Sequence, residues 1–290
     1  MKKKITISSE KRKDIINKAI PITLVAIMLI SGFNSISAFM NYRAANKEYT
    51  GLTQYVAPAT SAPAEAQSQT ASVEESEAET QAETEATEET VARPEIPNMD
   101  IDFDSLKGIN EDFVGWLIVP ALEISYPILK GPDNEHYLHE TFEHNHNKAG
   151  AIFMDSFNYP DFRDLNTFIY GHNMRDGSMF GSLKKLGEQP ELIDDEPYIY
   201  VYTPRASYQF QIVAYYTTYK KSDTYQFITN PKEYDAYLDY IGQVNELTNV
   251  PKTDYSEYPK LMTLSTCKGS AGTSNRFVIH SVLVNKVKNE

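Results

Sequence analysis

The hydrophobic and polar positions divide the chain into an apolar N-terminal stretch, a polar middle and a long region of short apolar runs. Residues 19–40 contain no charged side chain over 22 positions, and seven basic side chains precede them in residues 1–18. A helix of this length spans roughly 30 Å, about one hydrocarbon core. The basic flank predicts that residues 1–18 form a cytoplasmic tail and that the remainder lies outside the cell.

The apolar stretch has two interpretations. The sequence Ser-Ile-Ser-Ala at 35–38 is compatible with the small-residue cleavage site of a signal peptide. The apolar run is longer than the roughly 7–15 residues of a usual signal-peptide core, so we favour an uncleaved transmembrane signal-anchor over 19–40. Both interpretations export the rest of the chain, but only the anchor keeps it on the membrane.

The polar middle, residues 41–97, is predicted to be an extracytoplasmic acidic linker. Residues 61–90 contain nine Glu and no Lys, Arg or Asp, and the stretch from about 57 to 95 has no aromatic side chain. Such a composition cannot bury enough apolar surface to offset its ordering entropy. Charge repulsion extends a chain of this kind, so we expect a disordered spacer between the anchor and the domain that follows.

Residues 98–290 are expected to form one mainly β domain, with a short helix at its start capped by Asp104. Short apolar runs separated by turn residues predict eight strands, which suggests a closed or nearly closed barrel. The predicted strands are 116–119, 124–129, 150–154, 167–170, 198–203, 208–217, 260–265 and 276–284. Short helices are predicted at 134–140, 178–187 and 231–247, the last from a capping Asn followed by Pro.

Composition and charge narrow the classes of function. The formal net charge is -13, and much of it belongs to residues 61–90. There is no basic stripe of the kind that binds nucleic acid, so no nucleic-acid partner is expected. The chain has one cysteine and therefore no intrachain disulfide. An unpaired cysteine in an exported protein indicates a reactive thiol, although a buried inert one is the alternative.

Three residues at the ends of predicted strands carry candidate chemistry. Cys267 follows an apolar strand and precedes a turn-rich loop, a position suited to a nucleophile. Arg276 begins the next strand, and antiparallel pairing would bring its guanidinium close to Cys267, where it could stabilise an oxyanion. His172 follows another apolar strand directly after a glycine and could transfer protons.

The motif TLSTC at 263–267, the downstream Arg276 and the motif YGHNM at 170–174 together resemble the sortase family over about residues 98–288. A helical segment before the barrel and the long insertion at about 219–258 make it similar to class B. Some class B members carry an acidic residue after the cysteine, whereas this chain has Lys268. A carboxylate at that position therefore cannot assist Cys267.

The resemblance implies an eight-stranded sortase β-barrel and a cysteine transpeptidase without a cofactor or metal. Cys267 would attack the Thr carbonyl of a C-terminal sorting motif on an exported protein and form a thioester. His172 would be the acid and base, and Arg276 would position the substrate. The acceptor would be an amine of a peptidoglycan precursor, or a pilin lysine in a pilus-polymerising enzyme. Ser265 and Thr266 could contact substrate or simply pack the end of the barrel.

Other functions remain to be weighed. A papain-like protease would have its His after the Cys, and the Cys context of an L,D-transpeptidase is absent. A wall-binding or adhesive domain with an idle thiol is the non-enzymatic alternative, but it would not need His, Cys and Arg at strand ends. A metal site is a weaker hypothesis, because polar residues typical of a solvated loop surround the four candidate ligands His136, His139, His144 and His146.

Overall fold

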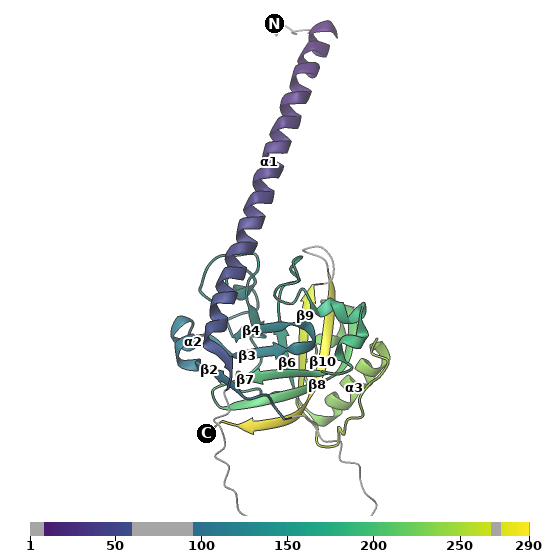
Figure 1. The fold of residues 1–290 in the computed structure, drawn as a ribbon. Coiled ribbons are helices and arrows are strands. Elements are labelled where there is room, and N and C mark those ends of the chain that lie inside the picture. The colour runs from purple at the N-terminus through teal and green to yellow at the C-terminus, as the bar shows by residue number, and fades with distance from the viewer. Residues whose placement is uncertain (1–8, 60–94, 268–273, 290) are drawn as a thin grey trace, which may run out of the picture.

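The computed structural model describes residues 9–59, 95–267 and 274–289, and its main body is a closed eight-stranded β-barrel (Figure 1). All eight predicted strands are present, with ends shifted by up to three or four residues. Their bounds are β3 (Phe113–Val119), β4 (Ile124–Leu129), β5 (Ile152–Met154), β6 (Asn166–Tyr170), β7 (Tyr198–Tyr202), β8 (Ala206–Tyr219), β9 (Leu261–Cys267) and β10 (Asn275–Lys288).

The strands close in the order β10-β8-β7-β3-β4-β5-β6-β9, with β9 paired to β10. Most neighbours are antiparallel, but β4 with β5 and β6 with β9 are parallel. Parallel neighbours need a long connection. The connection between β6 and β9 contains two strands and the insertion after β8. Because β6 and β9 are parallel, their polar C-terminal ends lie at the same edge of the barrel.

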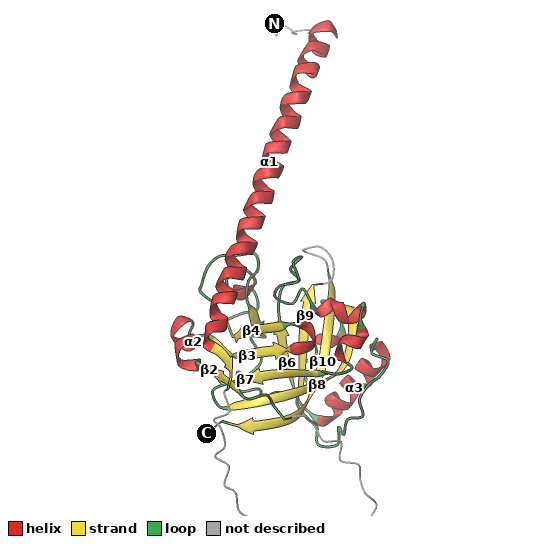
Figure 2. Ribbon diagram, in the orientation of Figure 1, coloured by secondary structure: helices red, strands yellow, loops and turns green. Residues whose placement is uncertain are grey.

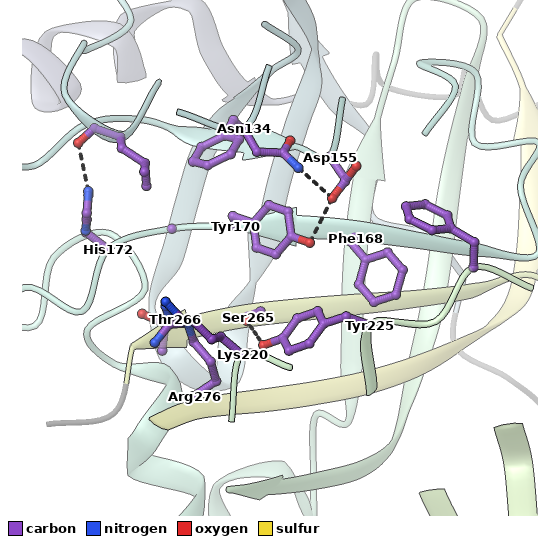
Figure 3. Close-up of a pocket in the computed structure, with 14 residues that line it drawn as sticks. Asn134, Asp155, Phe168, Tyr170, His172, Lys220, Tyr225, Ser265, Thr266 and Arg276 are labelled. Carbon is purple, nitrogen blue, oxygen red and sulfur yellow. Dashed lines mark hydrogen bonds between the residues drawn. The ribbon is translucent and has the colours of Figure 1, made fainter. Parts of the chain in front are cut away.

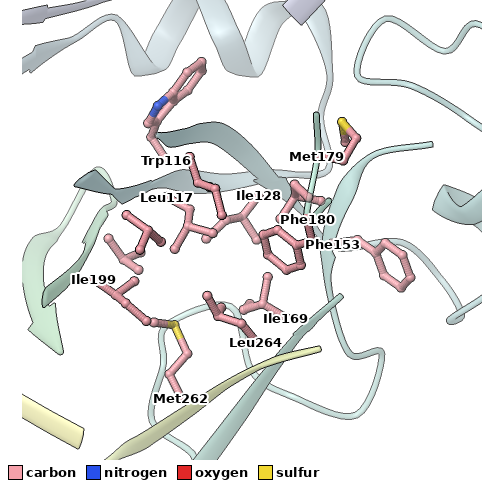
Figure 4. Packing of buried hydrophobic residues seen from close by; sticks show 14 of the residues in the cluster. Trp116, Leu117, Ile128, Phe153, Ile169, Met179, Phe180, Ile199, Met262 and Leu264 are labelled. Atoms are coloured by element: carbon pink, nitrogen blue, oxygen red, sulfur yellow. The ribbon is translucent and has the colours of Figure 1, made fainter. Parts of the chain in front are cut away.

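Side chains that alternate along the strands fill the barrel interior (Figure 4). Leu117 from β3, Ile128 from β4 and Ile169 from β6 meet Met262 and Leu264 from β9, and all are fully buried. The intervening positions of β9 and β10 face outward, where they pack in a second cluster against the insertion. The period-2 pattern of the sequence thus produces a core on both faces of these two strands.

The helices differ more from the prediction than the strands (Figure 2). The helix before the barrel, α2 (Phe103–Ile109), is capped by Asp102, whose carboxylate accepts a hydrogen bond from the Ser105 backbone N–H; the expected cap, Asp104, lies in its first turn. The helix predicted at 231–247 is confirmed as α3 (Pro231–Val244), with Asn230 as its cap. The helices predicted at 134–140 and 178–187 are instead short 3₁₀ turns, η3 (His136–Leu138) and η4 (Leu183–Gly187). Four further turns are η1 (Thr53–Tyr55), η2 (Pro120–Leu122), η5 (Pro190–Ile193) and η6 (Asp223–Tyr225).

Helix α1 (Ser9–Leu52) is the longest element and projects from the barrel (Figure 1). The segment Asn17–Tyr55 contains an 18-residue window of mean hydropathy 1.9, so it is long and apolar enough to cross a membrane. The large apolar side chains of residues 20–40 are exposed. Further along the helix Ala45, Tyr49 and Leu52 recur at helical spacing and are buried against the barrel.

The predicted boundary between anchor and linker therefore changes. Residues 41–58, which the composition assigned to the linker, form the docked end of α1, η1 and the strand β1 (Val56–Pro58). β1 pairs antiparallel with β2 (Met99–Ile101), and the Ala59 N–H donates to the Asn98 carbonyl oxygen at 3.0 Å. Residues 60–94 lie outside the described residues. The two flanks of this segment are joined to each other, and the barrel is in contact with the end of α1 that precedes it.

A buried polar network joins the insertion to the outer face of β9 and β10. Thr263 donates to the Asn166 side-chain oxygen at 3.0 Å, so its hydroxyl accepts from Nδ1 of His280 at 2.9 Å. Nε2 of His280 then accepts from the Tyr216 hydroxyl at 2.9 Å. Both ring nitrogens are satisfied in the neutral form, and burial lowers the pKa of His280 to about 3.

This network predicts a pH dependence of stability. An unfolded histidine has a pKa of about 6.5. Between pH 6.5 and 3 the unfolded chain binds a proton at His280 and the folded chain does not. The free energy of unfolding should therefore fall as the pH drops through this window, by up to about 1.4 kcal/mol per pH unit.

Urea unfolding of the wild type and of His280→Gln at several pH values would measure this contribution. The wild type should lose more stability than the variant between pH 6.5 and 4, whereas the exposed-site control His146→Gln should follow the wild type. Equal pH slopes for wild type and His280→Gln would show that His280 is not the responsible group.

Candidate active site

Two strand pairings determine which residues meet at the edge of the barrel. In the parallel pair β6–β9, Tyr170 lies opposite Ser265, and the Gly171 N–H donates to the Ser265 carbonyl oxygen at 3.2 Å. His172 and Cys267 are each two residues beyond this pair in the sequence. In the antiparallel pair β9–β10, Cys267 lies directly opposite Arg276. The predicted pairing of Cys267 with Arg276 is thus confirmed, and His172 is placed beside them along the same edge.

The glycine before His172 has a packing reason. A Cβ at Gly171 would lie 2.4 Å from Ile152 Cδ1 and within 2.8 Å of the Phe180 ring. The end of β6 therefore passes close against the core, and His172 leaves the strand at a fixed point.

The imidazole of His172 is held by a backbone carbonyl. Its Nε2 lies 2.8 Å from the Leu138 oxygen, and because a carbonyl only accepts, Nε2 carries the proton. In the neutral ring Nδ1 is then the basic nitrogen. Burial lowers the pKa of His172, and the charge of Arg276 and the nearby His139 lower it further, while the Leu138 carbonyl partly opposes this. The ring is thus biased to the neutral form until a counter-charge is present.

His172 and Arg276 line one pocket of about 340 Å³ at this edge (Figure 3). Phe153, Phe168 and Phe227 contribute apolar surface, and Phe168 and Phe227 pack with ring centroids 5.8 Å apart. A pocket with apolar walls and a few convergent polar groups is typical of a ligand site.

Ser265 and Thr266, the candidate substrate contacts, both line this pocket and both are buried. The Ser265 hydroxyl lies 2.7 Å from the Tyr225 hydroxyl, so it joins β9 to the insertion after β8. The Thr266 hydroxyl has no hydrogen-bond partner among the described residues. Of the two tyrosines singled out as possible groove residues, Tyr225 lines the pocket, whereas Tyr234 is buried and donates to the Pro259 carbonyl oxygen.

The sequence did not single out the acidic side of the pocket. Asp155 is buried and accepts hydrogen bonds from the Tyr170 hydroxyl and the Asn134 amide, each at 2.9 Å. Burial and the Asp155 carboxylate raise the pKa of Tyr170 well above its usual value, which keeps the phenol neutral. Asp155 follows β5 directly, so the strand-end position that identified His172 also marks it.

Two of the four histidines of the metal hypothesis contact a carboxylate. His136 and His144 are 3.2 Å and 3.1 Å from the Glu140 oxygens, and the rings of His139 and His146 are 6.2 Å apart. Within the described part of the chain, no group of three or more His, Cys, Asp or Glu is arranged to hold a metal ion. Lys268, the departure from some class B members, lies outside the described residues.

Comparison with known proteins agrees with the geometry. Residues 117–284, more than half of the chain, match the sequence profile of the sortase domain. This chain belongs to the sortase family. Sortase B of Listeria monocytogenes is 37% identical over 183 residues, which cover 62% of this chain and 73% of that protein. Sortase B of Staphylococcus aureus is 33% identical over 187 residues, covering 63% and 74%.

Solved sortase B structures share the fold. The Clostridium perfringens enzyme aligns with a TM-score of 0.57 at 29% identity, covering 63% of this sortase and 99% of that chain. A Staphylococcus aureus sortase B–substrate complex aligns with a TM-score of 0.57 at 30% identity, covering 63% and 84%. Family membership implies a cysteine transpeptidase that acts in anchoring proteins to the cell wall, and it disfavours the idle-thiol adhesive domain.

The contact between Ser265 and Tyr225 generates a prediction about the pocket. Ser265→Ala and Tyr225→Phe should each lower transpeptidation several-fold, because each leaves the other hydroxyl buried without this partner. The double variant should lose less than the sum of the single losses, with a coupling energy of about 1 kcal/mol.

A double-mutant cycle on kcat/KM for a cleavable peptide would measure this coupling, with Tyr219→Phe at an exposed tyrosine as the control. Additive losses would indicate that the two hydroxyls act independently of each other.

Proposed function

We propose that this sortase is anchored to the cell membrane by α1 and joins exported proteins to the cell wall, with Cys267 as its nucleophile. The observation that carries the proposal is the strand register that pairs Cys267 with Arg276, because Arg276 lines one pocket together with His172. The basic residues that precede the apolar segment support a cytoplasmic N-terminus and an extracellular catalytic domain. The proposed division is a tail at 1–18, an anchor at 19–40 and a catalytic domain that includes residues 98–290.

In the first half-reaction, the Cys267 thiol gives its proton to Nδ1 of His172, and the thiolate attacks the Thr carbonyl carbon of a C-terminal sorting motif. The negative charge that develops on the carbonyl oxygen is stabilised by the Arg276 guanidinium. The imidazolium then donates its Nδ1 proton to the departing amine, and a thioester remains on Cys267. Nε2–H keeps its bond to the Leu138 carbonyl throughout, which leaves Nδ1 as the nitrogen that exchanges protons.

In the second half-reaction an amine attacks the thioester. Nδ1 of the now neutral His172 accepts a proton from the amine, the new amide bond forms, and Cys267 departs as the thiolate. The pKa of His172, lowered by burial, suits this step because the neutral base is regenerated easily. We propose a peptidoglycan-precursor amine as the acceptor; a pilin lysine is the alternative.

A peptide assay on the full-length chain in detergent would test the function. Fluorogenic peptides of the Leu-Pro-x-Thr-Gly and Asn-Pro-x-Thr-x types would be incubated with and without an amine acceptor, and mass spectrometry would locate the acyl group. We expect cleavage after Thr, a thioester on Cys267 and an amine-dependent product.

The variants should separate the roles. Cys267→Ala should form no thioester, His172→Ala should lower kcat by roughly 10²–10⁴, and Arg276→Ala should lower it by roughly 10²–10³. The exposed-site variant His146→Ala is the control for His172. An acyl adduct that persists in Cys267→Ala would contradict the proposed nucleophile. Comparing a peptidoglycan stem peptide with a pilin-like lysine peptide as acceptor would distinguish wall anchoring from pilus assembly.

A further inference from the structure

The docked end of α1, residues 41–52, contacts the loop at 139–150, which lies between this helix and His172. Glu48 is the main contact. One of its carboxylate oxygens accepts from the Thr141 hydroxyl at 2.9 Å and from the Asn145 amide at 3.1 Å, and the other accepts from the Glu143 N–H at 2.9 Å. A single side chain of α1 thus holds three alternate residues of the loop between 141 and 145.

The far end of the loop is held by the next residue of α1. Tyr49 is buried, and its hydroxyl donates to the Gly150 carbonyl oxygen at 2.7 Å. About two helical turns earlier, the Asn41 carbonyl oxygen accepts from the Asn147 amide at 3.0 Å. α1 therefore contacts both halves of the loop.

The end of the loop packs against residues 137–138, and the carbonyl of Leu138 binds His172. The Ala151 N–H donates to the Tyr137 oxygen at 2.9 Å, and Gly150, at φ +57°, lies so close that a Cβ there would be 2.9 Å from the Leu138 oxygen. The backbone at Gly150 is thus packed against residues 137–138. The Leu138 carbonyl, held in this way, accepts from Nε2 of His172.

We propose that Glu48 and Tyr49 are positioning residues for His172, acting through the 139–150 loop and the Leu138 carbonyl. The inference rests on the proposed role of His172 in proton transfer. A fixed Leu138 carbonyl selects the tautomer with the proton on Nε2, which leaves Nδ1 as the reactive nitrogen. A loosened loop allows the other tautomer, in which Nδ1 already carries the proton and cannot act as the base.

The test uses the full-length chain in lipid nanodiscs and the variants Glu48→Gln, Tyr49→Phe and their double. Glu48→Gln keeps the size of the side chain but replaces one acceptor oxygen by a donor, and Tyr49→Phe removes only the hydroxyl, so neither creates a large cavity. Lys47→Ala, at an exposed position of the same helical turn, is the matched control. One readout is the tautomer of His172 from ¹⁵N imidazole shifts at pH 8, assigned by comparison with His172→Gln. The other is kcat/KM for thioester formation on Cys267.

We expect the wild type and Lys47→Ala to show the Nε2–H tautomer alone. The double variant should show a mixture of tautomers. Its kcat/KM should be lower by about tenfold, because the loss of each hydrogen bond is expected to lower kcat/KM by a factor of roughly two to ten. An unchanged tautomer in the double variant would overturn the inference, whether or not the rate falls, since a fall without it would reflect a general structural role. If the wild type forms no thioester, the proposed function fails, and the tautomer comparison still decides whether α1 positions the ring.

Discussion

The parallel pairing of β6 with β9 is the constraint on which the site depends. It sets the ends of two strands level although about a hundred residues separate them, and the antiparallel neighbour β10 then adds the third residue. A slip of one residue in either pairing would exchange the faces of the strand. The core prevents such a slip, because Met262 and Leu264 would leave the interior while polar Thr263 entered it. Core packing and catalytic geometry are therefore fixed by the same register.

The outer face of these strands is as firmly held as the inner one. α3 packs Tyr234, Tyr237 and Ile241 onto it, and hydroxyl and imidazole groups satisfy each other beneath the insertion. A buried polar network whose members are paired with one another makes the packing above it rigid. The insertion after β8 consequently has few alternative positions, and the pocket wall that carries Tyr225 is joined to β9, the strand that ends at Cys267.

Much of the barrel could be predicted because its signals are local. Short apolar runs between turn residues predicted eight strands, and polar residues at strand ends singled out His172, Cys267 and Arg276 as candidates, of which Cys267 and Arg276 are paired as expected. The parts that were missed depend on contacts between distant segments. Ala45, Tyr49 and Leu52, which pack against the barrel, form only a weak apolar stripe at helical spacing inside a polar region. The strands β1 and β2 are too short to show a period of apolar residues. The 3₁₀ turns at 136–138 and 183–187 replace predicted helices because neither segment is long enough to sustain one against its tertiary contacts.

The pairing of β1 with β2 also decides how far the catalytic domain can reach. Since the acidic segment leaves and returns at the same two-stranded ribbon, a change in its length would not move the pocket relative to α1. With α1 as the proposed membrane anchor, the distance of the barrel from the bilayer is set instead by the few helical residues between the exposed apolar part of α1 and Ala45, its first buried contact with the barrel. The reaction at Cys267 would then take place at a fixed distance from the membrane surface. Substrates would have to reach that distance by lateral diffusion along the membrane.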